Sequence, residues 1–163
     1  MNDVIKPVKL GLAIVMLSLF SGVGMGVSFG VSEDMYKSYV SDNVAKYPDV
    51  HDAKSNSKIW RYAQRAHFHS TGIAVFSLGL VILTMFSSMS VGLKSRTSTL
   101  IGLGGLYPLS WYTMFYLAPS IGRNAAHAHI VTETFTYIGV GGLLLGMTIL
   151  FLNVFFGLLI DDH

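Results

Sequence analysis

The chain contains no cysteine among its 163 residues. Disulfide bonds, thiolate metal sites and iron–sulfur clusters are therefore excluded, because each of them needs cysteine sulfur. A metal ligand would have to come from histidine, methionine or a carboxylate. The methionines are scattered along the sequence, which is more typical of packing than of a metal relay. Histidine and carboxylate side chains are thus the ligands to look for.

Charged residues are also scarce. They make up 12% of the chain, about half the share found in an ordinary soluble domain, whereas hydrophobic residues make up 52%. This balance predicts a membrane protein. The basic residues are interleaved with acidic ones, so nucleic-acid binding has no support. No nucleotide-binding loop and no serine–histidine–aspartate arrangement is present, so the sequence does not decide whether the protein is an enzyme.

Four long apolar runs cover residues 10–31, 66–91, 99–119 and 130–160. Each run offers the roughly 20 residues that a helix needs to cross a bilayer. The first run is interpreted as a helix and not as a cleavable signal peptide, because it is long enough to span and no clear cleavage site follows. The sequence therefore predicts an all-α integral membrane protein, with residues 1–163 forming a single domain of four transmembrane helices.

The one long polar segment, residues 32–64, is predicted to form a partly helical cap outside the membrane. Ser32 is a good N-cap for a helix that acidic residues follow. Pro48 and Asp49 mark a turn. A second helix is expected to begin after this turn and to enter the membrane without a break, with Trp60 at the level of the headgroups.

Basic residues at the ends of the runs suggest an orientation, although they point both ways. Lys6 and Lys9 before the first run, with Lys94 and Arg96 between the second and third, favour cytoplasmic N- and C-termini in a bacterial inner membrane. A larger number of basic residues lies on the opposite side. We favour the cytoplasmic termini because the first helix usually dominates.

The two halves of the chain share a short motif. Residues 66–69 read A-H-F-H and residues 126–129 read A-H-A-H, about sixty positions apart and each at the start of an apolar run. Two repeated hairpins of the same orientation would bring the second and fourth helices together about an axis along the membrane normal. The halves resemble each other little outside the motif, so coincidence remains the alternative.

Helical geometry limits which histidines can meet. Residues two apart on an α-helix point about 200° apart, so one member of each pair should face inward. His67 continues into a stripe of small and polar residues, and His129 continues into a stripe that contains Glu133, which favours these two as the inward pair. The repeat instead favours matching members of the two pairs. All four could meet if the first helical turn were unwound.

Four histidines with Glu133 inside the apolar region predict a metal centre, because ionisable residues in spanning segments are rare and usually functional. The predicted ligands are His67, His69, His127, His129 and Glu133. One candidate is haem b held by one imidazole from each motif. The other is a copper, zinc or iron ion held by several imidazoles, with Glu133 as a further ligand or as a partner that orients one.

Three arginines lie close to the motifs: Arg61, Arg65 and Arg123. They are predicted to bind the propionates of a haem, since a carboxylate favours a guanidinium partner. Snorkelling of their side chains towards the interface is the alternative.

Gly22, Gly26 and Gly30 lie four apart on one face of the first helix, and this spacing allows another helix to approach closely. That helix could belong to the same chain, to a second copy or to another subunit. Two functions follow from the sequence. The first is a histidine-ligated metal centre near the outer face that serves electron transfer or a larger respiratory or oxidase complex. The alternative is a cofactor-free structural or accessory subunit.

Overall fold

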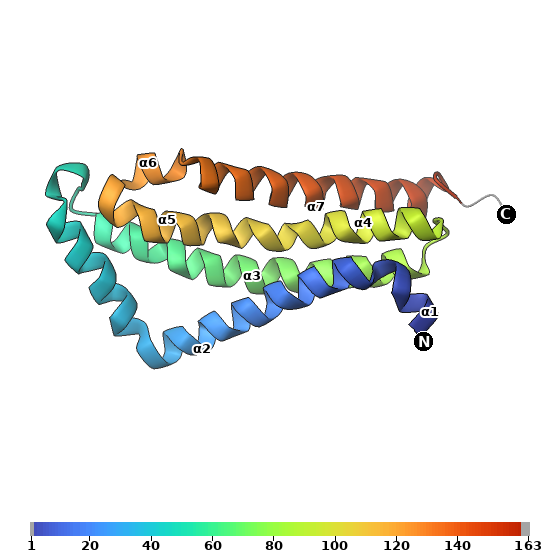
Figure 1. Ribbon diagram of the computed structural model, residues 1–163, viewed down its shortest axis with the longest axis horizontal. Coiled ribbons are helices and arrows are strands. Elements are labelled where there is room, and N and C mark those ends of the chain that lie inside the picture. The colour runs from blue at the N-terminus through green and yellow to red at the C-terminus, as the bar shows by residue number, and fades with distance from the viewer. Residues whose placement is uncertain (1, 161–163) are drawn as a thin grey trace.

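A computed structural model describes residues 2–160, with side chains from residue 3 onwards. Every regular element in this range is helical (Figure 1). The elements are α1 (Asn2–Ile5), η1 (Lys6–Val8), α2 (Lys9–Lys46), η2 (Pro48–Val50), α3 (Ser55–Phe86), α4 (Val91–Leu103), η3 (Gly104–Leu106), α5 (Tyr107–Ile121), α6 (Arg123–His127) and α7 (Ile130–Phe156). The prediction of an all-α chain is confirmed.

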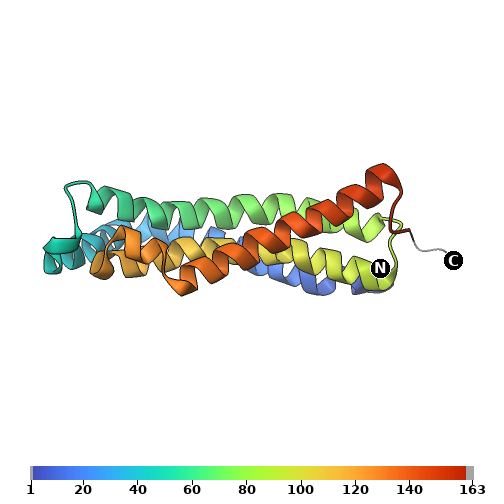
Figure 2. The same cartoon turned by 90° about the horizontal axis from the view of Figure 1, so that it is seen from above.

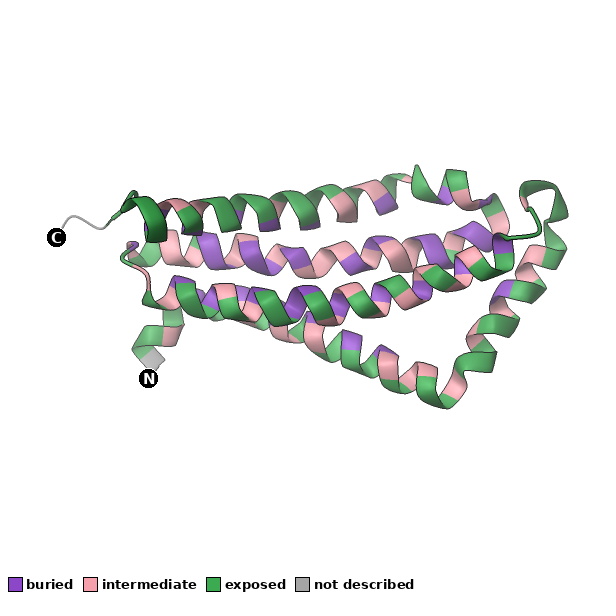
Figure 3. Cartoon of the chain, turned by 180° about the vertical axis from the view of Figure 1, so that it is seen from behind, coloured by how far each residue is buried: buried purple, intermediate pink, exposed green. Residues whose placement is uncertain are grey.

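Three helices are long and apolar enough to cross a membrane. They are the helix that ends at Lys46, the 32-residue α3 and the 27-residue α7. These helices contain most of the first, second and fourth apolar runs. Their outer faces expose large hydrophobic side chains such as Phe20, Phe76 and Phe151, and exposed residues follow α2 and α7 along their lengths (Figure 3).

The third apolar run is divided between two shorter helices. α4 and α5 follow one another along the bundle and are separated by the 3-10 turn η3 (Figure 1). Pro108 is the second residue of α5, and it cannot continue a helical ladder from α4 because proline has no backbone N–H. α4 begins earlier than the run itself. The Ser90 hydroxyl caps it by accepting a hydrogen bond from Leu93 N (3.3 Å), so Lys94 and Arg96 lie inside the helix instead of in the connection.

The cap between the first two long helices is helical, as the sequence predicted. α2 bends at Ser32, where the backbone leaves helical geometry (φ −137°, ψ 32°), and its second part returns to the bundle at an angle (Figure 1). Aromatic side chains fill the angle between this part and the bundle. Phe29 meets Trp60 with ring centroids 5.2 Å apart, and Tyr36 lies 6.2 Å from Phe115. The turn predicted at Pro48 is η2, and α3 then runs from Ser55 to Phe86 without a break.

The order of packing differs from the one that the repeat suggested. α2 packs on α3, α3 packs on α5, and α7 packs on α4 and α5, with only slight contact between α3 and α7. Figure 2 shows α7 crossing α4 and α5 at a slant. Glycine on α7 explains this choice of partner: a β-carbon at Gly139 would lie 2.6 Å from Tyr107 N, and one at Gly146 would lie 2.8 Å from Ile101 N. The bundle therefore does not bring α3 and α7 together, the helices of the second and fourth apolar runs.

The glycines of the first helix make their close contacts within the chain. A β-carbon at Gly22 would lie 2.8 Å from Thr71 N, and one at Gly26 would lie 2.7 Å from His67 Cε1. A β-carbon at Gly30 would meet nothing within 4 Å among residues 3–160. The spacing allowed a partner helix from the same chain, a second copy or another subunit. For Gly22 and Gly26 the partner is α3 of the same chain.

Candidate functional site

The first histidine motif lies within α3, where the helix is continuous. His67 and His69 therefore point to different sides. His67 faces α2 and donates a hydrogen bond from Nδ1 to the carbonyl oxygen of Gly22 (2.8 Å). Its ring also meets the edge of Phe29, with centroids 5.9 Å apart. These contacts make His67 part of the seam between α2 and α3.

His69 faces α5 instead. Its ring is stacked on Trp111 with an interplanar angle of 20° and a centroid distance of 5.7 Å, and it meets Tyr107 edge-on at 5.1 Å. One turn earlier on α3, the Arg65 guanidinium carbon lies 4.7 Å from the centroid of the Trp111 ring. Trp111 is thus in contact with an imidazole and a cation from the same helix.

The second motif spans a break in the helix. α6 ends at His127, Ala128 leaves helical geometry, and His129 is the N-cap of α7. The Nδ1 atom of His129 accepts a hydrogen bond from Val131 N (3.3 Å). The Thr132 hydroxyl bridges the break by donating to the carbonyl of Ala126 (2.8 Å). As a result His127 and His129 belong to different helices, although only one residue separates them.

A pocket of about 120 Å³ lies between α5, α6 and α7, and Trp111, His127 and Glu133 share it. Tyr107 and Tyr137 also line this pocket, which we call the Trp111 pocket. The indole Nε1 of Trp111 is buried and has no hydrogen-bond partner among residues 3–160. Glu133 is half-buried, and its carboxylate makes no ion pair within the same range. The pocket is therefore lined by a carboxylate, an imidazole and an indole ring.

The structure separates the two histidines that the sequence favoured as the inward pair. His67 lies against α2, and His129 lines a groove between α5 and α7. His69 and His127 are the members that reach Trp111 or its pocket. In the part of the chain that is described, no three histidine or carboxylate side chains come close enough together to hold a metal ion. The ligand roles of the five predicted residues remain predictions.

The histidine pair favoured for a bis-imidazole haem b is not brought together. A bis-imidazole haem needs two histidines that face each other, and His67 and His129 lie on different sides of the bundle. The Trp111 pocket, at about 120 Å³, is also smaller than the roughly 300–1,000 Å³ of typical cofactor sites. A single ion makes a smaller demand on space, and a nitrogen and oxygen donor set suits copper, zinc or iron.

The three arginines have different surroundings. Arg123 pairs with Asp52 (2.9 Å), which joins the start of α6 to the cap. Arg65 lies over Trp111, and Arg61 is exposed on the cap end of α3. Hydrogen bonding from the Ser55 hydroxyl lowers the pKa of the Asp52 carboxyl, with the Lys54 backbone N–H and the charge of Arg123 acting in the same direction. At least Arg123 thus has a structural partner in the chain.

Sequence reasoning missed one residue near the site, His51, and gave too little importance to another, Trp111. His51 donates from Nε2 to the carbonyl of Pro119 (2.8 Å) and so ties the cap to α5. It lies in a short turn with no motif around it, so nothing in the sequence indicated this contact. Trp111 could be predicted only as one of several aromatics on its helix, because their spacing is equally typical of ordinary packing.

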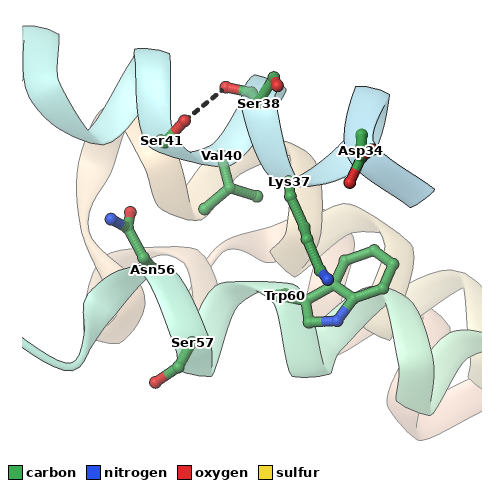
Figure 4. A pocket seen from close by; sticks show the side chains of 8 residues that line it. All are labelled: Asp34, Lys37, Ser38, Val40, Ser41, Asn56, Ser57 and Trp60. Carbon is green, nitrogen blue, oxygen red and sulfur yellow. Dashed lines mark hydrogen bonds between the residues drawn. The ribbon is translucent and has the colours of Figure 1, made fainter. Parts of the chain in front are cut away.

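A larger groove of about 500 Å³ lies away from the histidines, between the cap part of α2 and the start of α3 (Figure 4). Val40 and Trp60 supply its apolar surface, and Asp34, Lys37 and Asn56 surround them. Lys37 forms an ion pair with Glu33 (3.0 Å) on its own helix. None of the predicted site residues lines this groove.

No family model, curated protein or solved structure matches the chain.

Proposed function

We propose that the chain is an integral membrane protein that binds one transition-metal ion in the Trp111 pocket, with His127 and Glu133 as ligands. His69, on the α3 side of Trp111, supports the site by stacking on the indole ring. Copper, zinc and iron are the metals that such donors favour. In this role the protein serves electron transfer or a larger respiratory or oxidase complex, with its N- and C-termini on the cytoplasmic side of a bacterial inner membrane.

Four spanning helices follow if α4, η3 and α5 act as one. α4 has 13 residues and α5 has 15, so each alone is too short to cross. Together they are long enough, and they follow one another along the bundle (Figure 1). The exposed hydrophobic faces of α2 and α7 support insertion, because a soluble protein rarely exposes long apolar patches.

The observation that carries the proposal is the shared pocket of Glu133 and His127. Glu133 lies in the first turn of α7, the helix with a mean hydropathy of 2.1 over its most apolar part. An ionised carboxylate in such a segment is costly unless a cation or a hydrogen-bond donor compensates for it. A bound cation next to a neutral imidazole supplies that compensation.

Elemental analysis and optical spectra of the gently solubilised, assembled protein test the proposal. We expect about one copper, zinc or iron per chain and no Soret band. Glu133→Gln should lose the metal while its melting behaviour is retained. Glu33→Gln is the matched control, because this glutamate is exposed in the cap and pairs with Lys37, and it should keep the metal.

The absence of these metals from the assembled wild-type protein would refute the metal site. A strong Soret band with reduced α and β bands would replace the ion by haem. Equal metal content in Glu133→Gln and Glu33→Gln would remove Glu133 from the ligand set.

The second candidate is a cofactor-free accessory subunit of a membrane complex. Its support is that His67 bonds to Gly22 and that His129 caps α7, since both are structural roles. Under this candidate the purified protein contains no metal and His67→Ala weakens assembly with its partners. Native gels of membranes carrying the variant, together with the metal analysis, distinguish the two candidates.

A further inference from the structure

A second hollow follows the other side of the contact between α5 and α7. This groove has a volume of about 380 Å³, and its surface is almost entirely apolar or aromatic. Leu109, Tyr112 and Tyr116 line it from α5, and Phe135 lines it from α7, with His129 also on its wall. The Trp111 pocket uses a different face of each helix. The groove is therefore a separate site.

His129 is a lining residue of the groove whose ring can offer a hydrogen-bond donor. Its Nδ1 atom accepts from Val131 N, so this nitrogen carries no proton. In a neutral imidazole the proton then lies on Nε2, which becomes an N–H donor. Among residues 3–160 the bond from Val131 N is the only hydrogen bond of the His129 ring. The neighbouring Thr113 hydroxyl is already used, because it donates to the carbonyl of Leu109 (2.9 Å).

Two tyrosine rings contribute to the lining of the groove. The rings of Tyr112 and Tyr116 are nearly parallel, at 20°, with centroids 6.4 Å apart. Flat rings favour stacking on such surfaces. From Leu117 to Leu109 the lining of α5 extends about 12 Å along the helix, at 1.5 Å per residue. The groove thus combines a donor, a stacking surface and an apolar length.

We propose that this groove binds a membrane quinone. A quinone carbonyl accepts the hydrogen bond from His129 Nε2, the ring lies against Tyr112 and Tyr116, and the start of the isoprenoid tail follows Leu109 and Phe135. A phospholipid acyl chain fits the apolar surface but has no ring to stack on the tyrosines. The inference goes beyond the metal site and does not depend on it, because no residue of the Trp111 pocket is needed.

Photolabelling of the full chain in phosphatidylcholine nanodiscs tests the proposal. The probe is an azidoquinone, its sites are mapped by mass spectrometry, and decylubiquinone is the competitor. We expect saturable labelling of residues 109–117 and 129–135 that decylubiquinone prevents. His129→Ser keeps an N-cap acceptor but removes the Nε2 donor, so binding should weaken about fivefold, as for one lost hydrogen bond.

A second pair of variants tests the space itself. Thr113→Trp fills the groove and should abolish labelling. Thr148→Trp is the matched control, because Thr148 is exposed on α7 outside the groove, and it should label like the wild type. The proposal is overturned if both variants label equally, if labelling is not saturable, or if decylbenzene, which lacks a carbonyl, competes as well as decylubiquinone. The last result would assign the groove to ordinary lipid chains.

Discussion

The two histidine motifs have nearly the same sequence and different structures. Residues 66–69 lie in the unbroken helix α3, whereas residues 126–129 cross the break between α6 and α7. In the first motif the two side chains point in different directions because they are two residues apart on one helix, so His67 contacts α2 and His69 contacts α5. In the second motif the break decides, and it leaves His127 in the Trp111 pocket and His129 at the N-cap.

Each motif therefore divides its histidines between hydrogen bonding to the backbone and contact with Trp111 or its pocket. His67 and His129 make hydrogen bonds to the backbone that hold helices in place. His69 and His127 have no hydrogen-bond partner among residues 3–160, and they lie at Trp111 or its pocket. A repeated sequence motif thus need not give a symmetric site, because the backbone around it determines which member faces inward.

The largest loss of stability should come from a change at the contact between α2 and the helix that carries the first motif. Gly22→Ala places a β-carbon 2.7 Å from Thr71 Cγ2 and 2.8 Å from Thr71 N, so α2 and α3 must move apart. We expect the free energy of unfolding to fall by about 1–3 kcal/mol, as for overpacked sites. Gly24→Ala is the control, since its β-carbon meets nothing within 4 Å among residues 3–160.

Circular dichroism melts in detergent compare the two variants. Gly24→Ala should be neutral or slightly stabilising, because alanine favours the helix. Equal melting of both variants would mean that the seam between α2 and α3 is not closely packed.

Removal of the histidines in the first motif should separate their roles. His67→Ala loses the bond to Gly22 and leaves a void beside Gly26, which together cost about 2 kcal/mol. His69→Ala loses its stacking on Trp111, which is worth about 1 kcal/mol. Melting curves should therefore rank His67→Ala below His69→Ala in stability. The reverse order would contradict the supporting role of His67.

The second motif is tested through its cap. His129→Ala removes the acceptor for Val131 N and should cost about 1 kcal/mol, whereas His129→Ser should restore most of the loss. Urea titrations at one pH measure both variants against the wild type. If serine fails to recover what alanine loses, His129 acts through something other than the cap.

The smallest effect concerns pH at the junction of cap and α6. The pKa of Asp52 is lowered in the folded chain, chiefly by the Ser55 hydroxyl. Its contribution to stability is therefore complete above the ordinary value of 3.8 and is lost as pH falls through the lower folded pKa. Asp52→Asn should flatten this part of the stability profile. Melts between pH 7 and pH 2 would show an unchanged profile if the Asp52 carboxylate contributed nothing to stability.

Much of the fold follows from the apolar runs, whose length and hydropathy predicted the helices that contain most of residues 10–31, 66–91 and 130–160. The division of the third run was harder to predict. A proline such as Pro108 interrupts a helical ladder, but the earlier start of α4 depends on the Ser90 cap, which lies before two basic residues. The hydropathy pattern alone does not indicate that a helix begins before the apolar run does.

The site was predicted less well than the fold. The small stripe beginning at His67 correctly marked a packed face, since Ser70, Ala74 and Ser77 are buried, but its neighbour at His67 is α2 and not α7. His129 was placed on the stripe of Glu133 by assuming one continuous helix, and the break at Ala128 turns it away. Rotation of one helix against another depends on tertiary contacts that periodicity does not contain.

The most direct test of the division between support and site is the metal content of four single variants, compared per folded chain. These are His67→Ala, His69→Ala, His127→Ala and His129→Ser, each purified intact and analysed for copper, zinc and iron. The account predicts that His127→Ala loses the metal, that His69→Ala weakens its retention, and that the other two retain it. Loss of the metal from His67→Ala and His129→Ser, with retention in His127→Ala, would contradict it.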